Sequence, residues 1–137
     1  PGRIRYSSAQ AMLGLAKLDG LDARLRLRAE RARLLASLLP PECVPQRVLP
    51  GATPAWYFFV VVLPRKATPI RRRLLLRGID AAAGDEIADD VSEILGDTNC
   101  PNVWALKHHT IALPMFDGIT ESEVIRVARA INRAMAR

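Results

Sequence analysis

The sequence predicts an α+β fold in which helices pack on one face of a small, mostly antiparallel sheet, preceded by a long N-terminal helix. Apolar residues recur at helical spacing near both ends of the chain. The middle holds short runs rich in β-branched and aromatic residues, which favour strands. Strands that alternate with helices and are joined by short turns are typical of a layered α+β domain.

The first helix is expected over residues 8–39, where leucine and alanine form an apolar stripe. Asp19 and Gly20 interrupt this stripe, and glycine lowers helix stability by about 1 kcal/mol. We therefore expect the helix either to bend or to divide in two at this point. Three arginines share another face of the helix and are expected to meet solvent or another domain: Arg24, Arg28 and Arg31.

The strongest strand pattern covers residues 55–63, which are aromatic or β-branched almost throughout. Because this run does not alternate with polar residues, it predicts a central strand covered on both faces. Shorter strands are expected over residues 46–49 and 110–115. A brief extended segment is expected to begin at Ile79.

Two further helices have recognisable ends. Residues 68–77 read as a helix with Thr68 as N-cap and Gly78 just beyond the last turn. The last helix is expected over residues 120–136. It opens with a capping box, formed by a threonine and a glutamate three positions later. Between these two helices, short helical segments are expected over residues 87–95 and 101–107.

The amino-acid composition and net charge limit the kinds of partner that the chain can bind. The chain of 137 residues is half hydrophobic and carries a net charge of +6. A basic chain favours anionic partners, but no groove-reading motif accompanies the charge, so nucleic acid is not expected.

No apolar run is long enough for a membrane span and no signal peptide is visible, so a cytoplasmic protein is expected. The chain begins at Pro1, so it is expected to be a processed product or a piece of a longer protein.

Three segments match the motifs of one known family, in order and across the whole chain. Residues 3–18, Arg-Ile-Arg-Tyr-Ser-Ser-Ala-Gln-Ala-Met-Leu-Gly-Leu-Ala-Lys-Leu, resemble Asn-Tyr-Arg-Met-Ser-Glu-Leu-Gln-Ala-Ala-Ile-Gly-Leu-x-Gln-Leu. Residues 56–61 match Trp-His-x-Phe-x-Val, and residues 77–79 match Arg-Gly-Ile. Residues 111–115 match Leu-Ser-Leu-Pro-Leu, and residues 119–124 match Leu-Thr-Glu-Glu-Glu-Val. Together they resemble the C-terminal part of the DegT/DnrJ/StrS family of PLP-dependent sugar aminotransferases.

The resemblance implies the small domain of a fold type I PLP enzyme. Residues 1–137 would then form one C-terminal domain, with residues 1–39 as a connecting helix and residues 40–137 as an α/β layer. Family members transfer an amino group, usually from glutamate, to a keto sugar bound to a nucleotide. The resemblance therefore implies PLP in the full-length parent, an upstream large domain that binds it, a homodimer and a nucleotide sugar substrate.

The family's chemistry needs a lysine that holds PLP as a Schiff base, and in the family this lysine lies upstream on the large domain. The chain's lysines are Lys17, Lys66 and Lys107, and none matches the Ser-x-x-Lys stretch that carries it. Each is expected to be a solvated surface residue. We therefore expect the chain alone to be catalytically incomplete, with no catalytic residue and no bound PLP.

Two arginines near the N-terminus are expected to contact the cofactor. In the family, the Asn and Arg of Asn-Tyr-Arg reach the active site of the neighbouring subunit. Arg5 matches that arginine, and Arg3 replaces the asparagine that contacts the cofactor phosphate. An arginine can pair with phosphate through two hydrogen bonds, so both are candidate cofactor-binding residues. The alternative is two exposed arginines on a terminal segment.

Two departures leave a second reading open. The acidic stretch of residues 80–86 replaces the family's His-Tyr-Pro loop, and carboxylates would repel a nucleotide phosphate. The chain could therefore be a non-catalytic binding or interaction module that keeps the aminotransferase fold. His108 and His109 have no third ligand at a suitable spacing, so no metal site is expected.

Overall fold

The computed structural model describes residues 7–87, 89–96 and 100–136 and confirms the α+β prediction. Its sheet has four strands in the order β1-β2-β4-β3, and each neighbouring pair is antiparallel. The strands are β1 (Val44–Pro45), β2 (Phe59–Val62), β3 (Ala82–Ala83) and β4 (Thr110–Leu113). The helices are α1 (Ser8–Leu18), α2 (Leu21–Leu38), α3 (Ala67–Leu75), α4 (Gly84–Ile87), α5 (Val91–Ile94), α6 (Pro101–His109) and α7 (Glu121–Met135).

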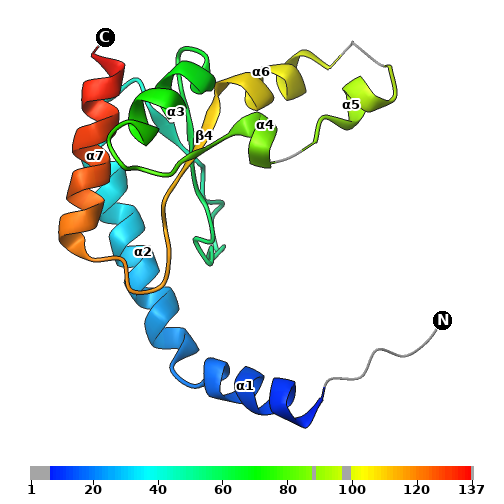
Figure 1. Cartoon of the computed structure of the whole chain (residues 1–137), viewed down its shortest axis with the longest axis vertical. Helices are drawn as coiled ribbons and strands as arrows, with labels where there is room; N and C mark the ends of the chain where they lie inside the picture. The colour runs from blue at the N-terminus through cyan, green and yellow to red at the C-terminus, as the bar shows by residue number, and fades with distance from the viewer. Residues whose placement is uncertain (1–6, 88, 97–99, 137) are drawn as a thin grey trace.

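The expected first helix is divided in two. Helix α1 ends before Asp19, and α2 begins after Gly20, whose φ of 72° lies in the left-handed region that favours glycine. The Arg24 side chain donates hydrogen bonds to the backbone carbonyls of Asp19, at 3.0 Å, and of Lys17. These bonds satisfy carbonyls that the end of α1 leaves without helical partners. In Figure 1, α1 therefore projects away from the sheet, whereas α2 runs beside α7.

The predicted strand at residues 46–49 is wrong, because the first strand is β1 at Val44–Pro45. Gln46 explains the shift. Its backbone N–H donates to the Val60 carbonyl at 2.9 Å, while its side-chain Oε1 accepts from the Val60 N–H at 2.8 Å. The side chain thus replaces the backbone in the ladder, and the chain leaves the sheet after this residue.

The strand predicted over residues 55–63 is present but shorter. Only β2 is extended in the sheet, and Trp56 before it has a φ of 50°, which is unusual for a residue other than glycine. The Trp56 ring stacks on Phe59, with ring centroids 5.6 Å apart. Strand β2 lies between β1 and β4, as a central strand should. Its expected burial on both faces is wrong for this chain, because Val62 is 37% exposed.

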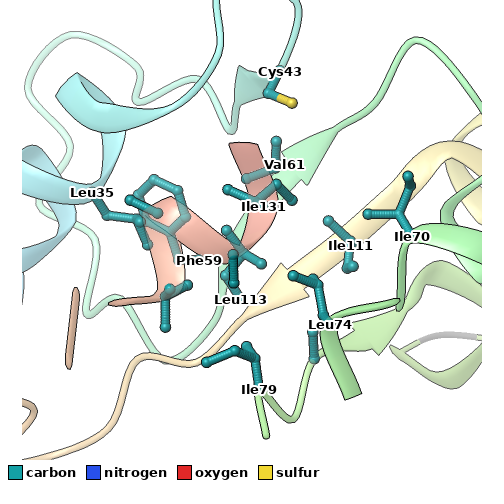
Figure 2. Close-up of a cluster of buried hydrophobic side chains, with 14 of the residues drawn as sticks. Leu35, Cys43, Phe59, Val61, Ile70, Leu74, Ile79, Ile111, Leu113 and Ile131 are labelled. Atoms are coloured by element: carbon teal, nitrogen blue, oxygen red, sulfur yellow. The ribbon is translucent and has the colours of Figure 1, made fainter. Parts of the chain in front are cut away.

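The core lies on one face of the sheet. The register pairs Phe59 with Leu113 and Val61 with Ile111, so these four side chains share a face. All four are buried. Figure 2 shows them converging with side chains from α2, α3 and α7, which cover this face: Leu35, Ile70, Leu74 and Ile131.

The middle of the chain departs from the predicted boundaries. Helix α3 begins at Ala67, one residue before the expected N-cap Thr68, and no side chain caps it. Instead of one helix over residues 87–95, two single-turn helices form, α4 and α5. The Asp90 carboxylate accepts hydrogen bonds from the backbone N–H groups of Ser92 and Glu93. Asp90 is therefore the N-cap of α5, so that this helix begins separately from α4. Helix α6 reaches His109, two residues beyond the expected end.

The last helix agrees with its prediction. Thr120 is the N-cap of α7, and its hydroxyl accepts from the Glu123 N–H at 3.3 Å. The Glu123 carboxylate in return accepts from the Thr120 N–H at 2.8 Å. The apolar stripe of α7 is buried against α2, α3 and the sheet, as its spacing predicts.

Removing a core side chain should destabilise the fold strongly. Ile131 is fully buried in α7, whereas Ile94 in α5 is 71% exposed. We expect Ile131→Ala to lower the free energy of unfolding by about 2–5 kcal/mol, through lost burial and the cavity it leaves. Ile94→Ala should change it by less than about 0.5 kcal/mol. Chemical denaturation followed by circular dichroism measures both, and equal losses would contradict this core.

The capping box should make stability depend on pH. Hydrogen bonds from the backbone and side chain of Thr120 hold the pKa of Glu123 below its ordinary value of 4.5. A lowered pKa means that the stabilisation is present above the unfolded value and is lost as pH falls through the folded value. Thermal melts should therefore show a smaller loss below pH 4.5 for Glu123→Gln than for the wild type. Glu30→Gln, at an exposed position of α2, is the control. Its melting temperature should depend on pH in the same way as that of the wild type.

Candidate functional site

The residues expected to contact the cofactor phosphate, Arg3 and Arg5, lie outside the described residues, so their role stays a prediction. The structure does place the lysines. Lys17 on α1 and Lys66 before α3 are exposed, as expected. Lys107 on α6 is not simply solvated, because its amine forms an ion pair with the Glu93 carboxylate.

That ion pair also shifts the pKa of Lys107. The hydrogen bond to the Glu93 carboxylate raises this pKa above its ordinary value, and partial burial opposes the shift. The negative charges of Glu93, Asp90 and Asp85 add to the increase. The shift strengthens the protonated state that lysine has at neutral pH. The Lys107 amine is engaged with Glu93, and the expectation that no lysine of this chain holds PLP stays a prediction.

The second face of the sheet is more open than the core face. Val60, Val62, Ala82 and Ala112 point to this face, opposite the core. The large helices α2, α3 and α7 lie on the other side, and α4 and α6 reach one end of this face. The alanines are small, so two hollows remain above the strands. We treat this open sheet face as the candidate functional surface.

The first hollow has a volume of about 230 Å³ and is mainly apolar. It lies between Val60 of β2 and the short helices α4 and α6, with Asp89 and Lys107 at its polar side. Gly84 makes this arrangement possible. A Cβ at this position would lie 2.5 Å from Thr110 Oγ1 and 2.8 Å from the Leu106 carbonyl oxygen.

The second hollow has a volume of about 350 Å³ and lies at the other end of the same face. It is lined by Ala82 and Ala112 of the sheet and by the aromatic side chains of Tyr57, Phe58 and Phe116. The three aromatic residues are exposed in the chain. Exposed aromatic rings beside a hollow are typical of a surface that another molecule or domain covers.

The acidic segment beside these hollows is partly neutralised from within. Glu86 forms an ion pair with Arg71, at 2.6 Å, and also accepts from the Ala83 N–H at 2.9 Å. Asp90 caps α5, and the Ser92 side chain together with the backbone of Ser92 and Glu93 lowers its pKa. The pairing with Arg71 reduces the repulsion that Glu86 would exert on an incoming phosphate, whereas Asp90 stays charged and Asp80 and Asp89 line the hollows without an ion pair among the described residues.

The remaining candidates do not assemble into a site. The His108 ring packs on Trp104, with ring centroids 4.6 Å apart, while Nδ1 of His109 lies 3.2 Å from the Leu63 carbonyl oxygen. Within residues 7–87, 89–96 and 100–136, no group of three potential metal ligands occurs. Burial raises the pKa of the Cys43 thiol to about 11, which keeps it protonated and unreactive.

Sequence reasoning missed how the arginines of α2 are used. Arg28 pairs with Asp117 at 2.5 Å and donates to the Ala55 carbonyl at 3.2 Å, next to the unusual backbone of Trp56. Arg31 pairs with Glu121 at 3.3 Å. The expectation of a face meeting solvent or another domain is therefore wrong for these two residues. Their partners are distant in sequence, so spacing along the chain could not indicate them.

The model of the DegT/DnrJ/EryC1/StrS aminotransferase family matches residues 3–132 of this sequence. The chain belongs to this family. The expected resemblance is thus confirmed over nearly the whole chain. No match to a curated protein was found.

Solved structures show the same fold at low sequence identity. DesV from S. venezuelae is 22% identical over 99% of this chain and 41% of its own, with a TM-score of 0.82. Helicobacter pylori PseC, an aminotransferase involved in the biosynthesis of pseudoaminic acid, is 18% identical over 98% and 39%, with a TM-score of 0.82. A candidate sugar aminotransferase from Streptococcus pneumoniae, in its PLP form, is 18% identical over 96% and 36%, with a TM-score of 0.83.

The chain spans only about two fifths of the length of these structures. Their shared fold agrees with the α+β class expected for this chain. Among the described residues, none of the helices combines the length and apolar character that crossing a bilayer requires.

Enlarging Gly84 should disrupt the first hollow. Gly84→Ala forces α4 away from α6, and overpacking of this kind costs about 1–3 kcal/mol. We expect a lower melting temperature, together with chemical-shift changes in an NMR spectrum at Val60 and Thr110. Gly14→Ala is the matched control. Its Cβ would meet nothing within 4 Å, so it should not lower the melting temperature.

Proposed function

We propose that this chain is the C-terminal domain of a PLP-dependent aminotransferase that acts on a keto sugar bound to a nucleotide, and that it is catalytically incomplete by itself. The observation that carries the proposal is the family match, combined with coverage of only about two fifths of the related structures. In the complete protein, an upstream large domain would hold PLP, and this chain would form one wall of the active site.

The lysines support the incompleteness. PLP supplies an electron sink once a lysine holds it, and an acid elsewhere keeps its ring nitrogen protonated. Lys17 and Lys66 are exposed and line neither hollow of the open sheet face, and the amine of Lys107 is paired with Glu93. The lysine that the reaction requires would therefore come from the upstream domain.

Uncovered apolar surface supports a larger assembly. Helix α1 buries none of its residues, although it carries four large apolar side chains: Met12, Leu13, Leu15 and Leu18. The open sheet face adds the exposed aromatic residues around the second hollow. We infer that the large domain and a second subunit of a homodimer cover these surfaces. Arg3 and Arg5, which precede α1, would then meet the cofactor phosphate of that second subunit.

The open sheet face is the surface we assign to the nucleotide sugar. Its mainly apolar hollow could accept the body of a sugar or a base, and the aromatic rings around the second hollow offer planar stacking surfaces. The pairing of Glu86 with Arg71 and of Glu93 with Lys107 reduces the repulsion of a diphosphate. This pairing weakens the main argument for the non-catalytic alternative. A cytoplasmic location would suit this chemistry.

The chain alone should not form a Schiff base with PLP. After addition of PLP, we expect no visible absorbance band that survives gel filtration, and no change in this result for Lys107→Ala or Lys17→Ala. The same chain joined to its upstream coding region should show the band, and glutamate should discharge it. A band in the isolated chain that one of these lysine variants removes would contradict the proposal. An upstream region without a Schiff-base lysine would favour the interaction module instead.

A further inference from the structure

Four arginines surround a hollow of about 320 Å³ on the outer surface of the molecule. Arg77 follows α3, whereas Arg126, Arg129 and Arg133 lie on α7. Helices α3 and α7 pack side by side, as Figure 1 shows, so the hollow spans the two helices. Ser122 and Ala130 complete its lining. We call this feature the arginine hollow.

Helix geometry brings these side chains together. Arg126, Arg129 and Arg133 are three and four residues apart, so they lie on one face of α7. Ala130 lies within the same face, and its small side chain leaves the space that the longer arginines enclose. On the other side, Arg77 Nη1 donates to the Arg73 carbonyl at 2.9 Å, which holds its guanidinium near the end of α3.

These arginines differ from those of α2 in their partners. Arg28 and Arg31 pair with carboxylates of the loop before α7 and of its first turn. In the part of the chain that the structure describes, none of the four arginines of the hollow has a carboxylate within ion-pair distance. Neighbouring like charges on a helix repel each other. Glu123, one turn before Arg126 on the same helix, offsets part of this charge. Among the described residues, the remaining positive charge of the hollow has no ion-paired carboxylate, so an anion would relieve it.

The shape and chemistry of the hollow select the anion. Guanidinium groups form two parallel hydrogen bonds with phosphate, and several together favour a multivalent phosphate over a single one. The three arginines of α7 extend over about 10 Å along the helix, at a rise of 1.5 Å per residue. This length exceeds what one phosphate needs. We propose that the arginine hollow binds a polyphosphate group, either inorganic polyphosphate or the phosphate chain of a nucleotide.

This site is separate from the surface proposed for the sugar substrate. The open sheet face lies opposite the core, whereas α7 covers the core side and presents the hollow outward. Binding there needs neither PLP nor the upstream domain. Loss of polyphosphate binding would therefore say nothing about aminotransferase chemistry, and loss of that chemistry would leave this inference intact.

The test compares two charge-matched variants by calorimetric titration with inorganic tripolyphosphate. Arg126→Gln, Arg129→Gln and Arg133→Gln together remove three charges from the hollow. The control, Arg26→Gln, Arg47→Gln and Arg65→Gln, removes three exposed charges elsewhere. We expect the first variant to bind tripolyphosphate at least about tenfold more weakly, because each lost hydrogen bond between a guanidinium and the charged phosphate weakens binding. The control should change affinity less than about twofold, since distant charges are screened by salt.

Further measurements keep the result interpretable. All six positions are exposed, and both variants should keep the circular dichroism spectrum of the wild type. In the unmodified chain, tripolyphosphate should shift the NMR signals of the arginine Nε–H groups and of the Ala130 amide. Adenosine triphosphate in place of tripolyphosphate distinguishes the sources. Equal affinity indicates recognition of phosphate alone, and tighter binding of the nucleotide indicates an added base contact.

Three outcomes would overturn the proposal. Equal weakening by the two variants would mean that net charge, rather than the hollow, attracts the anion. Shifts spread over the whole basic surface would mean the same. Tighter binding of a short DNA duplex than of tripolyphosphate, with both variants affected equally, would indicate a diffuse nucleic-acid surface instead.

Discussion

The pairing of β2 with β4 is the constraint on which the rest of this structure depends. Its register places Phe59 and Val61 beside Leu113 and Ile111 on a single face. That face is apolar throughout, and burying a side chain of this size contributes about 1.5–3 kcal/mol. The helices α2, α3 and α7 can cover it only from one side. A slip of β2 by one residue in this register would turn Phe59 and Val61 away from the helices.

The same pairing creates the functional surface. Because side chains alternate along a strand, a face that buries large residues leaves its neighbours on the opposite side. Here these neighbours include Val60, Ala82 and Ala112, which are too small to fill the space above the sheet. The two hollows follow from this division. One face of the sheet is buried in the core, and the other forms the open sheet face that we propose for the partner and substrate.

Arginine serves two distinct purposes in this chain. On α2, Arg28 and Arg31 bind Asp117 and Glu121, which tie the helix to the segment leading into α7. Arg24 meanwhile caps the end of α1 and sets the break between the two helices. On α7, the arginines enclose a hollow without such partners among the described residues. Composition shows only the excess of positive charge. The partners of each guanidinium show whether it forms an ion pair within the structure or is left to bind an anion.

The sequence by itself determined the features that depend on neighbours along the chain. These include the fold class, helix α7 with its capping box at Thr120 and Glu123, the central position of β2 and the family motifs. It also determined that no lysine fits the cofactor stretch. Tertiary structure decided the rest, because the deciding contacts join distant residues. Gln46 ends a strand by bonding to Val60, Glu93 forms an ion pair with Lys107, and the hollows exist only once β3, β4 and the short helices meet.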